Sequence, residues 1–227
     1  MSKLSIIIPV LNEGERIAAL LDGLAGMRAL GTEVIVVDGG SRDATIQRAR
    51  LRADRVISAP RGRAIQMNAG AGTASGDVLL FLHADTQIPR HTDHIVLSGL
   101  ERSGRAWGRF DVKIEGRHPL LRVVGFLMNL RSRLTGIATG DQAIFARRDA
   151  FQAAGGFPEI PLMEDIALCK RLKRVSRPLC ISEHAITSGR RWEENGVWAT
   201  VVLMWRLRLA YFLGADPKEL ARQYGYE

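Results

Sequence analysis

The chain has 227 residues, a formal net charge of +8 and two cysteines. At about 100–200 residues per domain, this length predicts one domain with a full core. Apolar residues make up 46% and charged residues 25% of the sequence, ordinary globular proportions that exclude wholesale disorder. Cys169 and Cys180 are too few for a disulfide framework or a four-cysteine zinc site, so we interpret both as small apolar side chains in a reducing compartment.

The first half of the chain alternates predicted strands and helices. Short apolar runs rich in β-branched residues are typical of buried strands, and apolar residues at helical spacing separate them. Asn12 is predicted to cap the first helix. The alternation predicts right-handed crossovers and a mainly parallel sheet. The expected strands are residues 4–10, 32–37, 55–58 and 77–82, and the expected helices are residues 13–27, 43–52 and 64–74.

Polar side chains follow the ends of these predicted strands. Alone, each could be a helix cap or a turn residue. Parallel strands end at one edge of a sheet, where ligands bind, so together the side chains predict a binding site. A carboxylate there can hold a hard divalent cation that also binds phosphate oxygens. The residues are Asn12, Glu13, Asp38, Ser41 and Asp85.

The second half of the chain has a less regular pattern. Expected strands are residues 108–114 and 143–146 with an extended segment near Ile186, and expected helices are residues 120–134, 164–174, 197–213 and 217–223. Glu164 and Asp165 are at the start of one predicted helix. They could be an acidic cap that complements the helix dipole, or a catalytic pair. Residues 190–192, Arg-Arg-Trp, suit either a solvated basic turn or a diphosphate site.

Three common nucleotide and metal motifs are excluded or weak. The sequence has no Gly-Lys-Ser/Thr of a P-loop and no zinc spacing of the His-Glu-x-x-His or Cys-x-x-Cys type. Residues 68–72, Asn-Ala-Gly-Ala-Gly, resemble a dinucleotide fingerprint only faintly, because they fall inside a predicted helix. We interpret them as a small-residue helix packed closely on the sheet.

The charge and hydropathy narrow the choice of partner and compartment. Arginine supplies 27 of the 32 basic residues, which suits phosphate recognition but also follows from compositional bias. Nucleic acid, a membrane surface and a phosphorylated small molecule all fit a basic chain. There is no signal-peptide pattern, and the longest strongly hydrophobic uncharged run, residues 195–205, is shorter than the ~20 residues of a bilayer span. We expect a cytoplasmic protein.

Five segments, read in order, resemble family 2 glycosyltransferases over nearly the whole chain. They are residues 5–13 (SIIIPVLNE), 36–43 (VVDGGSRD), 82–86 (LHADT), 164–165 (ED) and 190–192 (RRW). Residues 82–86, 134–142 (LTGIATGDQ) and 160–165 (IPLMED) are similar to one small bacterial subgroup, which is named for association with radical-SAM and selenodomain proteins or for arsenosugar biosynthesis.

The resemblance implies an α/β GT-A fold with a helical C-terminal tail. It divides the single domain into a nucleotide-binding half (1–86), an acceptor-binding half (87–192) and the tail (193–227). It implies inverting transfer of one sugar from a nucleoside-diphosphate sugar, which we expect to be a UDP-sugar, to a hydroxyl of a small-molecule or lipid-linked acceptor. Mg²⁺ or Mn²⁺ is the implied cofactor.

The resemblance also implies residue roles. Asp165 is the general base with Glu164 beside it, and Asp85 binds the metal. The nucleotide-binding positions are Pro9, Asn12, Glu13, Asp38, Arg61, Arg63 and Asp85, and the positions that close over the diphosphate and acceptor are Arg190, Arg191 and Trp192.

Three positions depart from the usual family pattern. Gly39 stands where a second aspartate is common, which puts the mode of ribose or base recognition in doubt. The usual Asp-x-Asp is His83-Ala84-Asp85 here, so that Asp85 is the one certain carboxylate and His83 is either a metal ligand or a packing residue. Ser188 replaces the glutamine of processive synthases, which favours a single transfer.

Two other functions remain as alternatives at this point. A nucleotidyltransferase needs a Gly-rich basic loop after the first strand, whereas this chain has Asn-Glu-Gly-Glu at residues 12–15. A non-catalytic protein that binds nucleotide or a membrane surface would use the basic, apolar helices 120–134 and 197–213, which are otherwise ordinary core helices. We expect no nucleic-acid partner, and peripheral contact with the inner membrane face.

Overall fold

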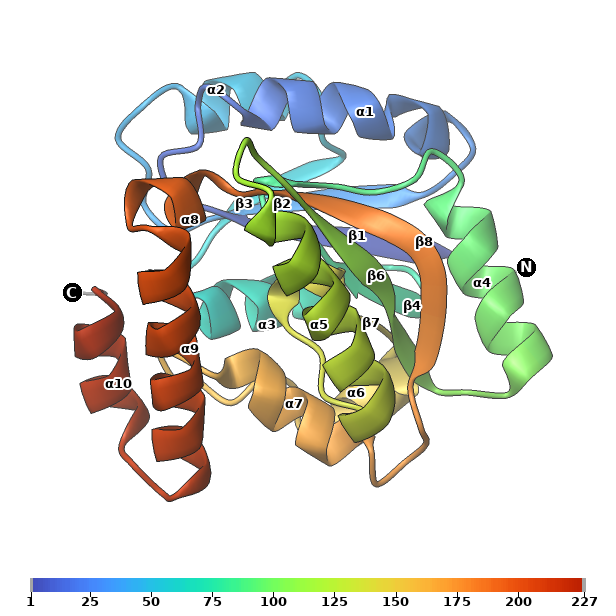
Figure 1. The fold of residues 1–227 in the computed structure, drawn as a ribbon. Helices are drawn as coiled ribbons and strands as arrows, with labels where there is room; N and C mark the ends of the chain where they lie inside the picture. The colour runs from blue at the N-terminus through green and yellow to red at the C-terminus, as the bar shows by residue number, and fades with distance from the viewer. Residues whose placement is uncertain (1, 226–227) are drawn as a thin grey trace.

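The computed structural model describes residues 2–225, which form a central sheet between layers of helices (Figure 1). Within these residues the sheet has eight strands in the order β3-β2-β1-β4-β7-β6-β8-β5. The pairs β3-β2, β2-β1, β1-β4 and β6-β8 are parallel, and the other three are antiparallel. The prediction of a mainly parallel sheet flanked by helices is confirmed, with an antiparallel β7 inserted at its middle.

The strands are β1 (Leu4–Val10), β2 (Glu33–Asp38), β3 (Arg55–Ser58), β4 (Val78–Phe81), β5 (Thr86–Gln87), β6 (Trp107–Glu115), β7 (Phe145–Arg147) and β8 (Leu179–Ser188). The helices are α1 (Ile17–Ala29), α2 (Thr45–Arg50), α3 (Arg63–Thr73), α4 (Thr92–Ser103), α5 (Leu120–Thr135), α6 (Arg148–Ala153), α7 (Glu164–Leu172), α8 (Arg190–Glu194), α9 (Val197–Phe212) and α10 (Pro217–Tyr224).

The first predicted helix begins later than its sequence suggests. We expected it at residue 13 with Asn12 as its cap, but α1 begins at Ile17 and Arg16 precedes it. Asn12 instead has a left-handed backbone, with φ of 55°. Its side-chain oxygen accepts from the backbone N–H of Arg42, and its own N–H donates to the hydroxyl of Ser41. Asn12 therefore joins the loop after β1 to the loop after β2.

The second half contains elements that the sequence pattern concealed. Helices α4, α6 and α8 were not predicted, and β8 is ten residues long where we expected only a short extended segment. The ladder of β8 with β6 slips between Phe110 and Asp111, which pair with Ile181 and His184. This irregularity breaks the two-residue alternation by which a strand is recognised.

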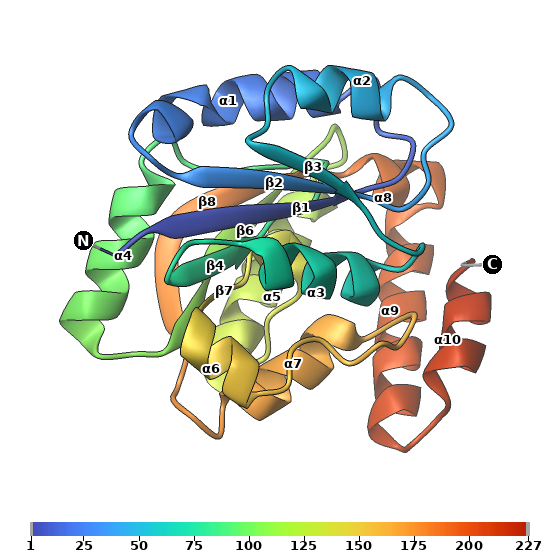
Figure 2. The ribbon, with the colours of Figure 1, turned by 180° about the vertical axis from the view of Figure 1, so that it is seen from behind.

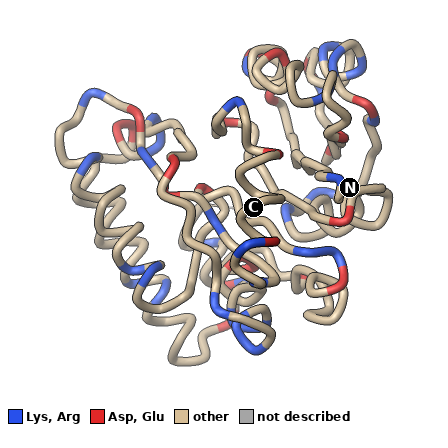
Figure 3. The backbone as a smooth tube through the Cα atoms, turned by 90° about the vertical axis from the view of Figure 1, so that its right-hand side faces the viewer, with Lys and Arg blue, Asp and Glu red and all other residues tan. Residues whose placement is uncertain are grey.

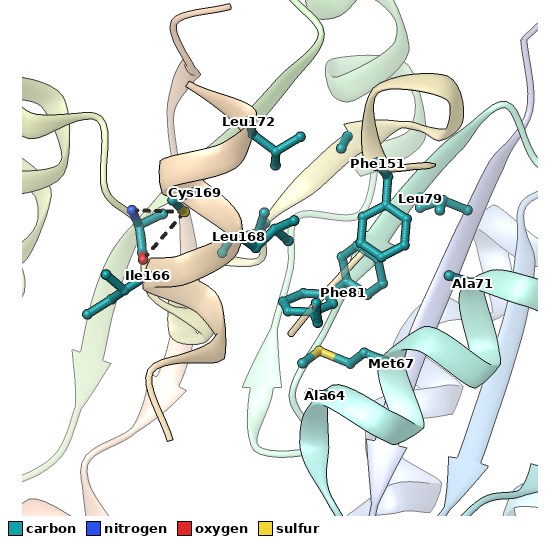
Figure 4. Packing of buried hydrophobic residues seen from close by; sticks show 14 of the residues in the cluster. Ala64, Met67, Ala71, Leu79, Phe81, Phe151, Ile166, Leu168, Cys169 and Leu172 are labelled. Atoms are coloured by element: carbon teal, nitrogen blue, oxygen red, sulfur yellow. Dashed lines mark hydrogen bonds between the residues drawn. The ribbon is translucent and has the colours of Figure 1, made fainter. Parts of the chain in front are cut away.

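The core has two main layers, one on each face of the sheet (Figures 1 and 2). Successive strand side chains point to opposite faces. Ile6 and Ile8 accordingly pack with α1, whereas Ile7 packs with α3 and the aromatic cluster around Phe81. Figure 4 shows this second layer between α3 and α7. There the sulfur of the buried Cys169 accepts from the backbone N–H of Ala138 and its thiol donates to the backbone oxygen of Ala138.

The small-residue stretch at residues 68–72 packs as expected. A Cβ on Gly70 would overlap Ile7 and Val37, so the glycine allows α3 to lie directly on the sheet. The stretch is a packing motif. Both cysteines are free, Cys169 is buried, and burial raises the pKa of its thiol to about 12.

The helices of the C-terminal half lie at different positions around the sheet: α5 in front of it, α6 and α7 below it, and α9 and α10 at the left of the view in Figure 1. Helix α5 packs on β6, and α9 and α10 form the outer wall on that side (Figure 1). No helix within residues 2–225 is long and apolar enough to cross a bilayer.

Candidate active site

One open cleft of about 1250 Å³ lies at the carboxyl ends of β1 and β4 and continues between α5 and α9. This is the sheet edge at which the sequence predicts ligand binding. Most predicted site residues line the cleft, although they come from five separate segments of the chain. They are Pro9, Glu13, Arg61, Arg63, His83, Asp85, Glu164, Asp165, Arg190, Arg191 and Trp192.

Two predicted nucleotide-binding residues shape loops beside the cleft and do not line it. Asp38 is buried, and its carboxylate accepts from the N–H groups of Gly40 and Ser41. Asn12 is exposed and holds the same loop from the other side. The structure therefore gives both residues a local role in loop shape, and contact with a nucleotide stays a prediction.

Glu164 and Asp165 open helix α7 and face different surroundings. Glu164 is buried, whereas Asp165 is partly exposed to the cleft. The preceding Met163 has φ of 69°, a left-handed conformation that is unfavourable for a side chain of this size. Strained backbone directly before two carboxylates in a cleft is typical of a functional site.

The carboxylate of Asp165 is held by the backbone around it. The N–H of Gly140 donates to its Oδ2 at 3.0 Å, and the N–H of Ile166 donates to its Oδ1 at 2.7 Å. A Cβ on Gly140 would overlap the His83 ring, so only glycine lets this loop approach both residues. Nδ1 of His83 lies 3.4 Å from Oδ1 of Asp141. The base candidate therefore has a fixed orientation.

Two carboxyl groups of the site have shifted pKa values in opposite directions. Burial, reinforced by the nearby charge of Asp165, raises the pKa of Glu164 to about 7. Burial also acts to raise the pKa of Asp141, but the hydrogen bond and charge of His83, with Arg63 and Arg208, outweigh it and lower that pKa. Near neutral pH, the carboxyl group of Glu164 is therefore partly protonated, whereas Asp141 is ionised.

Asp85 fits the single-carboxylate metal site that the sequence suggested. It is exposed in the cleft, and its charge and that of Arg16 act on Glu13, whose pKa is raised mainly by burial. Among residues 2–225 no three His, Cys, Asp or Glu side chains cluster closely enough to bind a metal together. Mg²⁺ commonly uses one or two carboxylates with substrate phosphates, so Asp85 suits a cation that arrives with a diphosphate.

The predicted basic residues of the cleft differ in their exposure and in the contacts that they make with other residues. Arg61 and Arg63 are exposed at the start of α3. Arg190 is also exposed and lies 3.8 Å from Glu194. Arg191 donates to the backbone oxygen of Tyr224 at 2.9 Å and stacks on its ring, which ties α8 to α10.

Trp192 has a packing role besides its place in the cleft. It packs against the small apolar cluster of β6, α5 and Val197. Residues 190–192 were expected to form a basic turn or a diphosphate site, and they lie in the first turn of α8.

Sequence reasoning missed several residues that complete the cleft. The amide of Gln66 donates to the backbone oxygens of Val10 and Val37 and fills the space beside Gly39. Arg131 and Arg208 also line the cleft. The sequence contains a signal for these two arginines. Each lies on a helix face whose residues four positions before it, three before it and three after it are apolar or aromatic, so an arginine there is unexpected.

Comparison with curated proteins finds relatives over part of the chain. A PGL/p-HBAD biosynthesis glycosyltransferase of Mycobacterium bovis is 38% identical over 91 residues, which are 37% of this chain and 36% of that protein. A glycosyltransferase of Mycobacterium tuberculosis with the same description matches to the same extent. The match thus spans about a third of the length of these relatives.

Solved structures match over most of the chain. S. aureus TarS 1-349 in complex with UDP-GlcNAc has a TM-score of 0.66 at 22% identity, covering 82% of this chain and 58% of that one. The mannosyltransferase PcManGT from Pyrobaculum calidifontis, in complex with GDP-Man and Mn²⁺, has a TM-score of 0.65 at 20% identity, covering 98% and 69%. At these identities the likeness shows the fold, and the predicted GT-A fold is confirmed.

Comparison with models of protein families shows to which family the chain belongs. The model described as glycosyl transferase family 2 matches residues 5–153, which hold β1 to β4 and the Asp85 loop. Nothing in this match favours the nucleotidyltransferase alternative. The chain belongs to glycosyl transferase family 2.

Proposed function

We propose that this protein transfers one sugar from a nucleoside-diphosphate sugar to an acceptor hydroxyl, with inversion at the anomeric carbon. The observation that carries the proposal is the single cleft that contains Asp85, the exposed arginines and the partly exposed Asp165. Inversion needs the attacking hydroxyl and the departing diphosphate on opposite sides of the sugar. A cleft that joins a carboxylate to a separate basic region accommodates that geometry.

Asp165 is the proposed general base. A sugar hydroxyl is a poor nucleophile, so a carboxylate must accept its proton as its oxygen attacks the anomeric carbon. The new C–O bond forms while the bond to the diphosphate breaks, and the diphosphate leaves with that electron pair. Asp165 suits this role because it is partly exposed and oriented by Gly140, whereas Glu164 is buried. Glu164 would tune the charge beside it.

The donor diphosphate is proposed to bind near Asp85, Arg61, Arg63 and Arg190. A divalent cation held by Asp85 would supply charge neutralisation for the leaving diphosphate. The exposed arginines contribute charge-assisted hydrogen bonds to the same phosphates. The UDP-GlcNAc complex of TarS and the Mn²⁺ complex of PcManGT support a nucleotide-sugar donor and a divalent cation. We favour UDP, with Mg²⁺ or Mn²⁺ as the cation.

The acceptor region suggests a substrate with an apolar part. Leu127, Leu134, Trp198 and Trp205 line the cleft between α5 and α9, and their side chains are 48% to 78% exposed. Several large apolar side chains exposed in one cleft are typical of a binding region. We propose a lipid-linked or otherwise apolar acceptor, which the protein reaches by peripheral contact with a membrane. The radical-SAM and arsenosugar subgroup stays a prediction.

A binding experiment tests this proposal directly. Thermal unfolding would be measured with UDP, GDP, ADP and CDP, each with Mg²⁺, Mn²⁺ or EDTA. We expect UDP with a divalent cation to raise the Tm most, because the cation bridges Asp85 and the diphosphate. Absence of stabilisation by every nucleotide would contradict the proposal. Binding of UDP without hydrolysis or transfer of any UDP-sugar would instead favour the non-catalytic alternative.

A further inference from the structure

Two arginines from different helices meet in the cleft on the side of Asp165 that faces α5 and α9. Arg131 lies on α5 and Arg208 on α9, and both line the cleft. The charge of Arg208 acts on Arg131, and the charge of Asp165 acts on both. Two cations are therefore held near each other beside the proposed base.

These guanidinium groups have unsatisfied donors. Nε and Nη2 of Arg131 and Nε of Arg208 are buried without a hydrogen-bond acceptor among residues 2–225. Buried donors are nearly always bonded in folded proteins, and an unsatisfied charged donor is costly. Burial, with the repulsion of Arg208, lowers the pKa of Arg131 to about 10, so it is still protonated at neutral pH.

Among residues 2–225, no carboxylate forms a close ion pair with Arg131 or Arg208. Asp165 attracts both arginines and Asp141 also attracts Arg208. The Asp165 carboxylate, however, accepts its hydrogen bonds from the backbone N–H groups of Gly140 and Ile166. No carboxylate oxygen of the described residues lies within 4.0 Å of a guanidinium nitrogen of either arginine. The buried Arg109, in contrast, is paired with Asp111. The pair is arranged for a ligand that brings its own negative charge.

The surroundings define what that ligand is like. One helical turn from Arg131 lie Leu127 and Leu134, and one turn from Arg208 lie Met204 and Trp205, all of which line the cleft. An anion that reaches the arginines therefore enters between apolar walls. Such walls strengthen a charge-assisted hydrogen bond because they exclude water.

We propose that Arg131 and Arg208 form an anion subsite that binds an acidic group of the acceptor, a carboxylate or a phosphate. This inference rests on the proposed function. The planar guanidinium forks would bind the acidic group through two hydrogen bonds each and hold the acceptor so that its hydroxyl faces Asp165. Arg131 and Arg208 are thus positioning residues for the acceptor.

The test uses three probes with one eight-carbon chain: octyl phosphate, octanoate and uncharged octyl glucoside. Binding is followed by tryptophan fluorescence, because Trp192, Trp198 and Trp205 line the cleft and Trp107 is buried. We expect at least one anionic probe to bind about tenfold or more tightly than octyl glucoside. Octyl phosphate as the tightest probe assigns a phosphate, and octanoate a carboxylate.

Variants locate the effect. Arg131→Gln and Arg208→Gln should each remove most of the preference for the anion, whereas Arg122→Gln on α5 and Arg206→Gln on α9 should keep it, because those two arginines are exposed and do not line the cleft. Equal binding of the three probes to the wild-type protein would overturn the subsite. So would an anion preference that survives in the Arg131→Gln/Arg208→Gln double variant.

The same preparations separate this inference from the function on which it rests. UDP affinity reports on the donor site, and the anion preference reports on Arg131 and Arg208. Wild-type protein that binds UDP but shows no anion preference contradicts the subsite alone. Protein that binds no nucleotide contradicts the proposed function, whatever the octyl probes show.

Discussion

The two ends of the cleft are built from different chemistry. The end near β1 and β4 presents exposed charged side chains, Asp85, Arg61 and Arg63, on short loops after strands. The end between α5 and α9 presents exposed apolar side chains around the partly buried guanidiniums of Arg131 and Arg208. Water screens the exposed charges at the first end more strongly than the partly buried charges at the second.

The contrast explains how one cleft can treat two substrates differently. An exposed charged surface binds a highly charged, hydrated molecule such as a nucleoside diphosphate and releases it again after reaction. A desolvated site between apolar walls selects by shape and by one fixed charge. Asp165 is hydrogen-bonded to Gly140, which lies against His83. Its charge acts on Arg131 and Arg208. This position fits the proposal that it acts where the two substrates meet.

The basic residues of the chain are not confined to this cleft. Figure 3 shows Lys and Arg positions on loops and helices around the whole backbone. The net charge of +8 therefore exceeds what the cleft requires. Four predicted arginines and two found in the structure line the cleft, as does Arg16. Others form ion pairs elsewhere, such as Arg28 with Asp54 and Arg109 with Asp111.

The largest effect is expected at the meeting point of the two regions. Asp165→Asn should lower sugar transfer by roughly 10³-fold, because the amide cannot accept the hydroxyl proton. Affinity for UDP should change less than about twofold, since the donor phosphates are proposed to bind at the other end. Transfer rate and UDP titration measure the two quantities. Asp93→Asn on α4 serves as the control, and parallel loss of rate and donor affinity would disprove the separation.

Glu164 should make the stability of this region depend on pH. Its pKa of about 7 in the folded protein lies above its ordinary 4.5, so the folded state loses stability as pH rises through that interval. The loss should reach about 3 kcal/mol above pH 7. Urea unfolding at pH 5 and pH 8.5 measures it.

Glu164→Gln should abolish this loss, because the amide has no proton to release. The variant should therefore gain stability relative to wild type as pH rises from 5 to 8.5. Glu101→Gln, at an exposed position of α4, should follow the wild-type curve. Parallel curves for wild type and Glu164→Gln would show that the buried carboxyl does not titrate as described.

The charged end should depend on a divalent cation through Asp85. Asp85→Ala should weaken UDP binding in Mn²⁺ by roughly 10- to 100-fold, because the cation loses its protein carboxylate. In EDTA the variant and wild type should bind UDP alike. Calorimetry with and without Mn²⁺ provides both values, with Asp93→Ala as the matched control. Equal Mn²⁺ dependence in the variant and wild type would remove Asp85 from the metal site.

The apolar end should contact anionic vesicles more weakly when its tryptophans are removed. Trp198→Ala/Trp205→Ala should reduce co-sedimentation with anionic liposomes by about fivefold to tenfold, since both side chains are more than 60% exposed. Leu30→Ala/Leu51→Ala removes equally exposed side chains at the ends of α1 and α2 and should have no effect. Equal losses in both variants, or none in either, would argue against a membrane-facing region here.

The local elements of the first half follow closely from sequence. Strands β1 and β3 were predicted with the bounds that they have, and α5 within one residue, because continuous apolar runs and helical stripes are local patterns. The Asn12 cap was wrong because contacts with Arg42 and Ser41, 30 and 29 residues away, decide the backbone there. Strand β8 was underestimated because its alternation is interrupted opposite Asp111.

The sequence by itself determined the residue types at the strand ends, the family resemblance and the order of the main elements. Only the tertiary structure decided which charges are partnered. Asp38 and Arg191 were both predicted to contact the substrates. In the structure the Asp38 carboxylate accepts from the N–H groups of its own turn, and the Arg191 guanidinium donates to the backbone oxygen of Tyr224 on α10. Arg131 and Arg208 lie 77 positions apart and became a pair only when α5 and α9 enclosed them. Desolvation and pairing depend on the whole fold, because they are set by neighbours that are distant in the chain.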